Sequence, residues 1–397
     1  MDVARLKRYA DISRTLEEDY VNIQPIQRGG VLTKEARKIL VDYGDGYSMC
    51  DHCLAGRLDL LENPPVQEFL RDVSEFLDMD EARLTAGCRH AKWVVFNSIC
   101  KKGSTIVIDS LAHYTTYLSA EAAGINVVEV PHSGYPEYKI NLDGYVDKIE
   151  EVKKETGKYP DLLVLTHVDY IYGNLCDARK VGDIAEEYDI PFLLNAAYTA
   201  GVMPVSGKKL KADFIACSGH KSWAAAAPVG ILATNYEYMD KIFRKSEIKG
   251  TWSGRSFPRK EVSLFGCPPA MGVTAATLMA SFPVVVQRIN HWKDEIEKTR
   301  YLVNELEKIK DVHQLGVKPK EHHLIHMEAP SFHNIAKKHP RKGWFLYDEL
   351  KDRKITGIQS GLTKHFKLSV YGLSWSQVEY VANSFKDLAE KYDIPVE

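Results

Sequence analysis

The sequence predicts an α/β protein, with a large domain built on a mostly parallel, helix-covered sheet and a smaller α+β domain after it. Two observations lead to this fold class. Between about residues 63 and 235, short β-branched runs alternate with segments of helical periodicity. A long amphipathic helix, a strand and a final helix follow later in the chain. We therefore expect a large domain at 63–285, a small domain at 286–397, and an N-terminal segment at 1–62 that packs with the small domain.

Length and composition are those of a globular protein with a substantial core. The chain has 397 residues, of which 45% are hydrophobic and 27% charged, and its formal net charge is -2. This balance does not indicate nucleic-acid binding, although a neutral total is compatible with a local basic face. The charged N-terminus lacks a signal-peptide pattern, so we expect a cytoplasmic protein without a membrane span. The seven cysteines then favour reduced thiols over a disulfide framework.

The large domain is expected to begin with a helix at 64–77, where a proline opens a run of helically spaced apolar residues. Apolar runs of strand length follow, separated by helical or loop segments. They are STIVID (104–109), NVVEV (126–130), DLLVLT (161–166), IPFLL (190–194), DFIAC (213–217) and VGILAT (229–234). This alternation is typical of parallel strands covered by helices.

The rest of the chain predicts a loop and then the small domain. The segment 246–269 is rich in Gly, Pro and Ser, which indicates a long functional loop. Apolar residues recur at helical spacing through 289–309 and predict a long amphipathic helix. The small domain should close with a strand in 366–373 and a helix in 376–392.

Polar residues follow several strands at the carboxyl edge, where doubly wound sheets bind their ligands. Ser218, His220 and Lys221 come directly after the run 213–217. A hydroxyl, an imidazole and an amine gathered there could bind a phosphate while the amine forms a Schiff base. A single lysine after a strand is more often a solvated charge. Other strands end near the polar residues His167, Asn174, Asn195 and Tyr198, each of which alone is more often a loop hydrogen-bonding residue.

Two further motifs lie upstream. In LTAGCRHAKWVVF, a turn at Gly87, Cys88 and Arg89 leads into a helix, whose free N–H groups favour a phosphate. An ordinary loop and helix cap is the plainer interpretation. After the run 104–109, His113 and Tyr114 offer flat rings that could lie over an aromatic cofactor, although an aromatic residue there is more often part of the core.

Taken in order, these motifs resemble the pyridoxal-phosphate enzymes of fold type I, in particular the class V aminotransferase branch that includes the cysteine desulfurases. The resemblance covers most of residues 63–390 and implies a seven-stranded sheet and pyridoxal 5′-phosphate as cofactor. Lys221 would carry the cofactor, and Ser218, His220 and the turn at 87–89 would hold its phosphate. The other cofactor-binding residues implied are Cys88, Arg89, His113, Asn174, Asn195 and Tyr198.

Further motifs resemble the archaeal family of O-phosphoseryl-tRNA:cysteinyl-tRNA synthases. They are MCDHC with Cys50 and Cys53, LFGCPP with Cys267, and GCRHAKW, AHYTTY, YTAGVMPVSG and SVYGLSW. The resemblance implies β-elimination of phosphate from phosphoserine esterified to tRNA(Cys), followed by addition of sulfur. It also implies a homodimer, a complex with phosphoseryl-tRNA synthetase, and three cysteines that carry persulfides or ligate an iron–sulfur cluster. Taken alone, the CxxC spacing favours two interpretations equally: a redox or metal-binding site, or a chance occurrence.

Two positions depart from the wider class. Asn195 stands where an acidic residue usually meets the pyridine nitrogen, and a neutral amide keeps that nitrogen less protonated. We hypothesise that this favours prompt β-elimination. Lys367 stands where related enzymes carry an arginine for the substrate carboxylate, which suits a substrate whose carboxyl group is an ester. The substrate-binding set implied is Arg89, His113, Tyr114, Arg255 and Lys367.

The resemblance also gives two surface expectations. Thr251, in the long loop, would reach the cofactor phosphate of the other subunit of a dimer. The basic stretches 244–255 and 337–342 are usually solvated faces, and under this function they become candidate contacts with the tRNA backbone.

Two alternatives remain open from the sequence. A cysteine desulfurase or selenocysteine lyase-like enzyme would use the same cofactor, and turnover of cysteine to alanine without tRNA would favour it. A non-enzymatic thiol or metal-binding assembly subunit would purify colourless even after incubation with pyridoxal phosphate.

Overall fold

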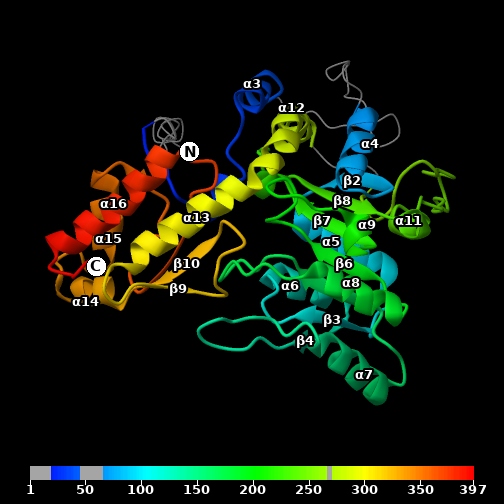
Figure 1. Ribbon diagram of the computed structural model, residues 1–397. Helices are drawn as coiled ribbons and strands as arrows, with labels where there is room; N and C mark the ends of the chain where they lie inside the picture. The colour runs from blue at the N-terminus through cyan, green and yellow to red at the C-terminus, as the bar shows by residue number, and fades with distance from the viewer. Residues whose placement is uncertain (1–18, 45–65, 266–270) are drawn as a thin grey trace, which may run out of the picture. The chain divides into compact units, whose positions relative to one another are not determined.

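The computed structural model describes residues 19–44, 66–265 and 271–397 (Figure 1). The described chain divides into two compact units. The larger unit comprises 26–44, 66–265, 271–297 and 315–324, and the smaller unit comprises 19–25, 298–314 and 325–397.

A seven-stranded sheet forms the centre of the larger unit, with the order β2-β8-β7-β6-β5-β3-β4. Only β8 runs antiparallel to its neighbours, as its pairings with β2 and β7 show. The mostly parallel sheet confirms the predicted fold class. Its strands are β2 (Glu81–Thr85), β3 (Thr105–Asp109), β4 (Asn126–Val130), β5 (Leu162–Thr166), β6 (Phe192–Asn195), β7 (Phe214–Ser218) and β8 (Gly230–Thr234).

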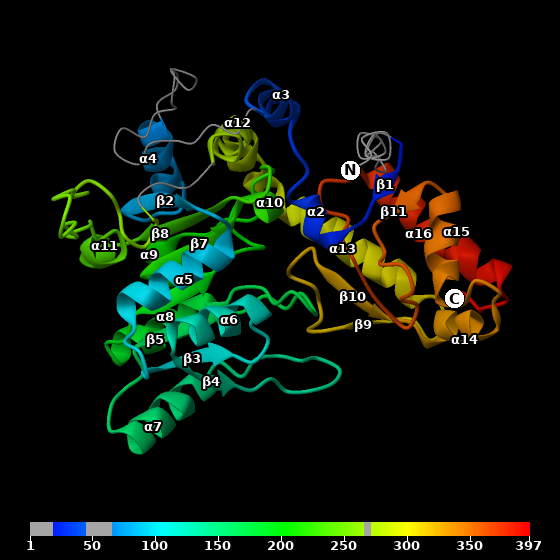
Figure 2. The same ribbon diagram turned by 180° about the vertical axis from the view of Figure 1, so that it is seen from behind.

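The central strands are apolar throughout because both faces of the sheet are covered. In β5, Leu163 and Leu165 belong to one buried cluster, whereas Leu162 and Val164 belong to another on the opposite face. One cluster contains buried residues of α4 (Val66–Phe76), α7 (Gly144–Thr156), α8 (Ala178–Glu187) and α12 (Gly272–Arg288). The other contains residues of α5 (Cys88–Ile99), α6 (Tyr114–Ala123) and α11 (Tyr236–Ile242), and Figure 2 shows α5 in front of the strands.

The structure differs from the sequence-based expectations at β2. The sequence analysis assigned no strand before Gly87. The strand EARLT alternates partly exposed and buried residues, as an edge strand does, and lacks the apolar run that marks the central strands. Its Arg83 donates from Nε to a carboxylate oxygen of Glu261 at 3.1 Å. The position of β2 at the edge of the sheet therefore explains why its hydrophobic pattern is weak.

The helix α12 was also not predicted, and it bears on the expectation that the chain has no membrane span. The helical stretch Gly272–Glu307 is long and apolar enough, by length and composition, to cross a bilayer. The core helix of a globular protein passes the same test. Here Leu278 and Val285 lie in the core, and Ser281 Oγ donates to the carbonyl oxygen of Ala224 at 2.6 Å. Its apolar side therefore packs inside the larger unit.

Short elements complete the larger unit. They are α3 (Lys34–Asp42), α9 (Gly207–Leu210) and α10 (Gly219–Ser222). The described part of the predicted long loop, 246–265, forms isolated bridges but no helix or strand. The larger unit also contains the four-residue helix α2 (Pro25–Arg28), apart from its first residue, and the short η3 (Ile289–His291).

The smaller unit has its own buried core around a three-stranded sheet of order β12-β10-β9 and a two-stranded parallel pair of β1 with β11. The predicted final strand and helix are confirmed, and Ser374 and Gln377 form a capping box at the start of the last helix. The elements are β1 (Val21–Asn22), α13 (Trp292–Glu307), β9 (His313–Leu315), β10 (Ile325–Glu328), α14 (Pro330–Lys338), η4 (Lys342–Trp344), α15 (Phe345–Asp352), β11 (Ile355–Thr356), β12 (His365–Leu368) and α16 (Trp375–Lys391).

Candidate active site

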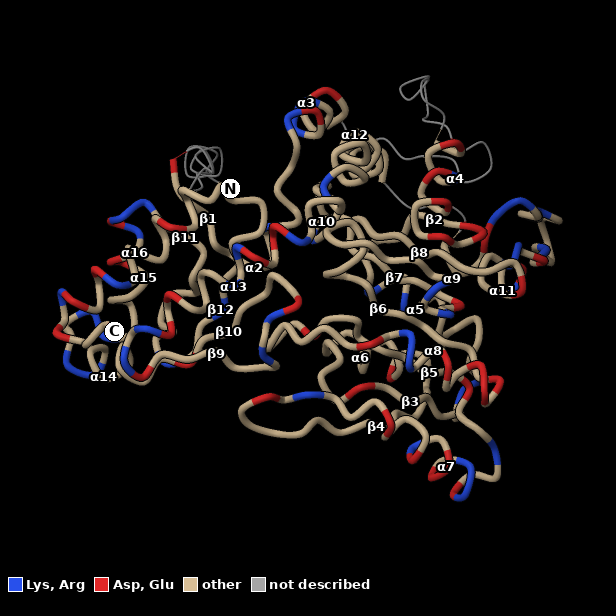
Figure 3. The backbone as a smooth tube through the Cα atoms, viewed as in Figure 1, with Lys and Arg blue, Asp and Glu red and all other residues tan. Residues whose placement is uncertain are grey.

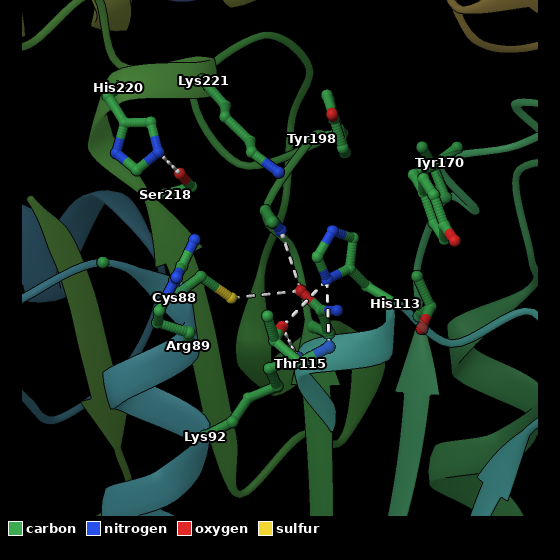
Figure 4. A pocket seen from close by; sticks show the side chains of 15 residues that line it. Cys88, Arg89, Lys92, His113, Thr115, Tyr170, Tyr198, Ser218, His220 and Lys221 are labelled. Carbon is green, nitrogen blue, oxygen red and sulfur yellow. Dashed lines mark hydrogen bonds between the residues drawn. The ribbon is translucent and has the colours of Figure 1, made fainter. Parts of the chain in front are cut away.

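A pocket lies at the carboxyl ends of the parallel strands, where the strand ends of β5, β6 and β7 meet the first turns of α5, α6 and α10 (Figure 4). This is the location at which open α/β sheets bind ligands. The residues that line it are Gly87, Cys88, Arg89, Lys92, His113, Thr115, Thr166, Val168, Tyr170, Asn195, Ala197, Tyr198, Ser218, His220 and Lys221.

Lys221 projects its amine into this pocket from α10, directly after the buried strand β7 (Figure 4). Its Nζ lies 4.5 Å from the centre of the Tyr198 ring. The short helix follows the strand without a loop because Gly219, packed against Val229, has no side chain that would obstruct the turn. Lys221 is therefore placed on a rigid element with its amine toward a concave site.

The turn before α5 has the form of an anion-binding site. Gly87 takes a φ of 92°, which favours glycine, and no side chain caps the helix that follows. The N–H groups in the first turn of such a helix, together with its dipole, attract a negative charge. Arg89 lines the same part of the pocket. Gly230 lets the backbones approach, because a Cβ there would lie 2.7 Å from the Cys88 nitrogen.

Ser218 and His220 face this turn from the other side. The Oγ of Ser218 and the Nε2 of His220 are 3.5 Å apart, and Nδ1 of the same ring lies 3.3 Å from the carbonyl oxygen of Val229. Burial lowers the pKa of His220, and the nearby Lys221 lowers it further. In the neutral imidazole, Nδ1–H donates to the carbonyl oxygen of Val229, and Nε2 accepts from the Ser218 hydroxyl.

His113 caps α6 and presents its ring to the pocket. Its Nδ1 accepts from the backbone N–H of Thr115 at 3.2 Å, so the proton of the neutral ring is on Nε2. The ring lies 4.3 Å from the centre of Tyr114 and 4.8 Å from that of Tyr170. A capping interaction and aromatic neighbours therefore fix the orientation of a flat ring.

Asn195 ends β6 and lies at the base of the site. Its Oδ1 accepts from the Cys88 thiol at 3.2 Å and from the backbone N–H of Ala197 at 3.3 Å. Opposite it in the sheet, Thr166 ends β5 at the paired register position. The strand ends therefore bring an amide, a hydroxyl and a thiol together.

Lys92 and Thr115 also line the pocket, although they were not predicted as site residues. Lys92 is buried and donates from Nζ to the hydroxyls of Thr115 at 2.9 Å and Thr116 at 2.6 Å. Burial lowers its pKa to about 8. The available signal was its position four residues after Cys88, one helical turn along the same face of α5. Tyr170, Val168 and Thr166 are further lining residues that were not selected.

Other predicted site residues lie elsewhere. Asn174 does not line this pocket, because its amide is engaged in the loop: Nδ2 donates to the carbonyl oxygens of Glu137 and Tyr138, and Oδ1 accepts from the N–H of Val317. The side chain instead lines a second cavity. Tyr114 contacts His113 but is 52% exposed and is not among the lining residues.

Thr251 and Arg255 are exposed on the long loop after α11, also outside the pocket lining. Lys367 lies in β12 of the smaller unit. The predicted sulfur-handling residues Cys50, Cys53 and Cys267 lie outside the described residues. Among the residues that the structure describes, no group of His, Cys, Asp or Glu is arranged to hold a metal ion.

The pocket fits pyridoxal 5′-phosphate by the chemistry of its groups. An aldehyde needs an amine, which Lys221 offers, and a phosphate needs the uncapped turn at Gly87 with Arg89 and Ser218. A planar heterocycle needs a flat ring to lie against, which His113 offers, and a polar partner for its nitrogen, which Asn195 offers. These residues come from separate elements and converge on one cavity.

Comparisons with known proteins give a consistent picture. The family model described as O-phosphoseryl-tRNA(Sec) selenium transferase, SepSecS, matches residues 94–390. O-phospho-L-seryl-tRNA:Cys-tRNA synthase 2 of Archaeoglobus fulgidus is 58% identical over 377 residues, which cover 95% of this chain and 96% of the relative. The O-phospho-L-seryl-tRNA:Cys-tRNA synthase of Methanopyrus kandleri is 51% identical and covers 98% of this chain and 99% of its own.

Solved structures agree. A crystal structure of a SepCysS–SepCysE N-terminal domain complex contains a chain that is 52% identical to this one, with a TM-score of 0.88 and coverage of 97% of this chain and 99% of that chain. A cysteine desulfurase from Thermococcus onnurineus NA1 has a TM-score of 0.71 and 21% identity, covering 96% and 99% of the two chains. The second likeness establishes the shared fold alone.

Proposed function

The chain belongs to the O-phosphoseryl-tRNA(Sec) selenium transferase (SepSecS) family, and from this premise we propose that it converts O-phosphoserine on tRNA(Cys) into cysteine. It is an enzyme of the pyridoxal-phosphate-dependent transferase type. The observation that carries the proposal is the convergence of the Lys221 amine, the uncapped turn at Gly87 and the amide of Asn195 on one pocket. The same pocket explains why a cofactor with an aldehyde, a phosphate and a ring nitrogen is required.

Pyridoxal 5′-phosphate, when bound through its aldehyde, makes the Cα–H bond of an attached amino acid acidic, which permits loss of a group from Cβ. Lys221 is the residue that holds this aldehyde, and its amine is the base that accepts the Cα proton. Arg89 and Lys92 line the same pocket and place further cationic side chains beside this amine. The phosphate leaves with the electron pair of the Cβ–O bond.

The second half of the reaction replaces the lost oxygen by sulfur. Sulfide adds at Cβ while Cα takes up a proton, so that one C–O bond is broken and one C–S bond is formed. Where the outer sulfur of a cysteine persulfide adds instead, a second cysteine thiol cleaves the S–S bond to release the product, and the disulfide left between the two cysteines needs a thiol reductant before the next turnover. Before this addition the amino acid carries a reactive double bond, which water must not reach. Tyr198 and Tyr170 line the pocket, and their rings are the groups suited to keeping water from this double bond. Both are therefore assigned to exclusion of water rather than to proton transfer.

We propose that Cys50, Cys53 and Cys267 deliver the sulfur, as persulfides or through an iron–sulfur cluster. Support comes from their residue type and from the CxxC spacing of the first two, which permits metal ligation or disulfide exchange. The thiols in the described part of the chain are less suited to this task. Burial raises the pKa values of Cys88, Cys100, Cys176 and Cys217, which disfavours the reactive thiolate.

The proposed partners are a second copy of this chain, other proteins, and tRNA. A homodimer in the cytoplasm would allow Thr251 to contribute to the cofactor phosphate of the other subunit. The complex in the solved relative supports a proposal that this chain also binds a SepCysE-like domain, and the synthetase that makes phosphoseryl-tRNA is a further proposed partner. The proposed contacts with the tRNA backbone are the Lys and Arg residues at α14 and in the loop after α11, which are coloured blue in Figure 3.

The decisive experiment incubates the purified protein with pyridoxal phosphate, phosphoseryl-tRNA(Cys) and sulfide, and identifies the amino acid on the RNA by mass spectrometry. We expect cysteine. Lys221→Ala should lower the rate at least about 10³-fold, in the range for loss of a positioned base. Serine or phosphoserine left on the RNA, or turnover of free cysteine to alanine at a comparable rate, would contradict the proposal.

A further inference from the structure

The carboxamide of Asn195 is held in a single orientation. Its Oδ1 accepts from the Cys88 thiol and from the backbone N–H of Ala197. A backbone N–H can only donate, so it identifies which end of the amide is oxygen. An amide oxygen has two acceptor sites, and both are occupied by these donors. The nitrogen end is therefore the part of Asn195 that remains for a ligand, and Asn195 lines the pocket.

Cys88 has one S–H and two acceptors within reach, and its shorter contact, at 3.2 Å, is to Asn195 Oδ1. It is the first residue of α5, is 8% exposed, and its sulfur also lies 3.5 Å from the carbonyl oxygen of Ala216. Burial raises the pKa of its thiol, although the cationic side chains of Lys92, Lys221 and Arg89 act in the opposite direction. The group therefore remains S–H. A thiol held in this way donates to Asn195 and does not serve as a nucleophile.

Thr166 adds a second polar group at the same end of the pocket. It is the register partner of Asn195 between β5 and β6, and it lines the pocket. Its Oγ1 is buried and lies beside the Asp109 carboxyl group, whose pKa it helps to lower. A hydroxyl can donate as well as accept, so it is compatible with an acceptor atom beside the Asn195 amide.

The charges around this position are unfavourable to another cation. The lining residues Arg89, Lys92 and Lys221 are basic, and no Asp or Glu is among the lining residues that the structure describes. Burial raises the pKa of Asp109 on β3 to about 7, and neither this carboxyl group nor that of the buried Asp169 lines the pocket. The other titratable groups in the lining are His113 at the start of α6, His220, Cys88, Tyr170 and Tyr198, and all of them are uncharged or cationic in their ordinary states at pH 7. A positive charge on a bound ring would therefore lack a carboxylate partner.

We propose that the pocket binds the ring nitrogen of pyridoxal phosphate in its unprotonated form, and that Cys88 is a positioning residue that enforces this by holding the N–H groups of Asn195 toward the ring. The proposal rests on the cofactor assigned under the proposed function. An unprotonated ring withdraws electrons less strongly than a pyridinium ring. This suits a substrate whose phosphate leaves readily from Cβ, and it disfavours transamination as a side reaction.

The direct test is a nitrogen NMR spectrum of the full-length protein loaded with pyridoxal phosphate that carries ¹⁵N in the ring. At pH 7 we expect the wild-type resonance at the downfield position of a neutral pyridine. Asn195→Asp should move it upfield toward the pyridinium position, because a carboxylate stabilises the protonated ring. A pyridinium resonance in the wild type overturns the inference.

The role of Cys88 is tested by a matched pair of variants. Cys88→Ser keeps a donor and should leave the pH at which the nitrogen takes up a proton unchanged. Cys88→Ala removes the donor and frees one acceptor site of Asn195, so that this pH should rise by about one unit, a tenfold increase in proton affinity. If the ring nitrogen takes up its proton at the same pH in Cys88→Ala as in the wild type, Cys88 is not a positioning residue.

A second measurement distinguishes a wrong cofactor assignment from a wrong protonation state of the ring. Borohydride reduction followed by mass spectrometry should place the cofactor on Lys221. Absence of that modification overturns the proposed function and the inference together. A modified Lys221 with a protonated ring nitrogen overturns the inference alone. The wild-type spectrum gives this answer even where a substituted protein fails to fold.

Discussion

Lys320 donates hydrogen bonds from its Nζ to the carbonyl oxygen of Tyr172 at 2.6 Å and to that of Gly173 at 3.0 Å. The amine is fully buried, and burial lowers its pKa to about 8. On the same loop, the carboxylate of Asp169 accepts from the backbone N–H groups of Ile171, Tyr172 and Asn174. These contacts close the loop whose first residues, Val168 and Tyr170, line the active-site pocket.

Lys320→Met should loosen that loop. Methionine keeps an unbranched apolar side chain but leaves two buried carbonyl groups without their donor, at a cost of about 1–3 kcal/mol in the free energy of unfolding. Chemical denaturation measures the loss, and hydrogen exchange should show faster exchange in 168–174. Lys318→Met, at an exposed neighbouring position, is the control and should change stability by less than about 0.5 kcal/mol. Equal effects of the two substitutions would contradict this account.

Asp109→Asn should change how stability depends on pH. Burial raises the pKa of Asp109 to about 7 from its ordinary value of 3.8, although a hydrogen bond from the Thr166 N–H at 2.7 Å acts against this shift. Between these pH values the unfolded chain releases the proton and the folded chain retains it. The contribution of Asp109 to stability is therefore full below pH 3.8 and is lost as pH rises through 7.

The Asp109→Asn variant should not lose stability in this way as pH rises, because an amide does not ionise. Denaturation curves at pH 5 and pH 8 should show that Asp109→Asn gains stability relative to the wild type as pH rises, by about 1.4 kcal/mol for each pH unit between 5 and the folded-state pKa of about 7. A difference between the two proteins that is independent of pH would contradict the assigned pKa.

Gly230→Ala should weaken the binding of phosphate. A Cβ at this position would lie 2.5 Å from the Gly87 carbonyl carbon and 2.7 Å from the Cys88 nitrogen, so the anion-binding turn must move. Forced insertion of a methyl group costs about 1–3 kcal/mol. Titration with pyridoxal phosphate should show a tenfold or greater loss of affinity. Gly103→Ala, where an added Cβ meets nothing within 4 Å, should retain cofactor affinity even if its positive φ lowers stability.

A basic hollow in the smaller unit is predicted to contact tRNA. It is lined by His333, Lys337, Lys342, Lys364 and His365, together with Ala336, Gly343, Gly361, Leu362 and Thr363, and this lining contains no Asp or Glu. Reversing Lys337 and Lys342 to Glu should weaken tRNA binding. The slope of log affinity against log salt concentration should fall by roughly 2, because each lysine that meets a phosphate releases about one counterion.

The control carries the same change of charge on another surface. Reversing Lys153 and Lys154 of α7, in the larger unit, alters the net charge equally. Identical losses of affinity in the two proteins would show a general effect of charge and would contradict a contact at the hollow. Filter binding at several salt concentrations provides both measurements.

Much of the fold could be predicted from the sequence because the central strands are buried on both faces. The apolar runs before Thr166, Asn195 and Ser218 can lie only in a covered sheet, and the polar residues that follow each run must then meet at its carboxyl edge. Lys221 and His113 could be found in this way, whereas the turn at Gly87 was indicated only by its position before a helix. The edge strand β2 was not, since half-exposed strands carry a weaker pattern.

By itself, the sequence determined which residue types end each strand and therefore which chemistry the pocket can hold. Tertiary structure alone decided how these groups are oriented and which buried groups join them. Lys92 enters the pocket, Asn174 is directed into a loop, and the Asn195 amide presents its nitrogen because Cys88 and Ala197 occupy its oxygen. The physical reason is that a hydrogen bond depends on distance and direction between atoms far apart in the chain, which residue order and spacing do not specify.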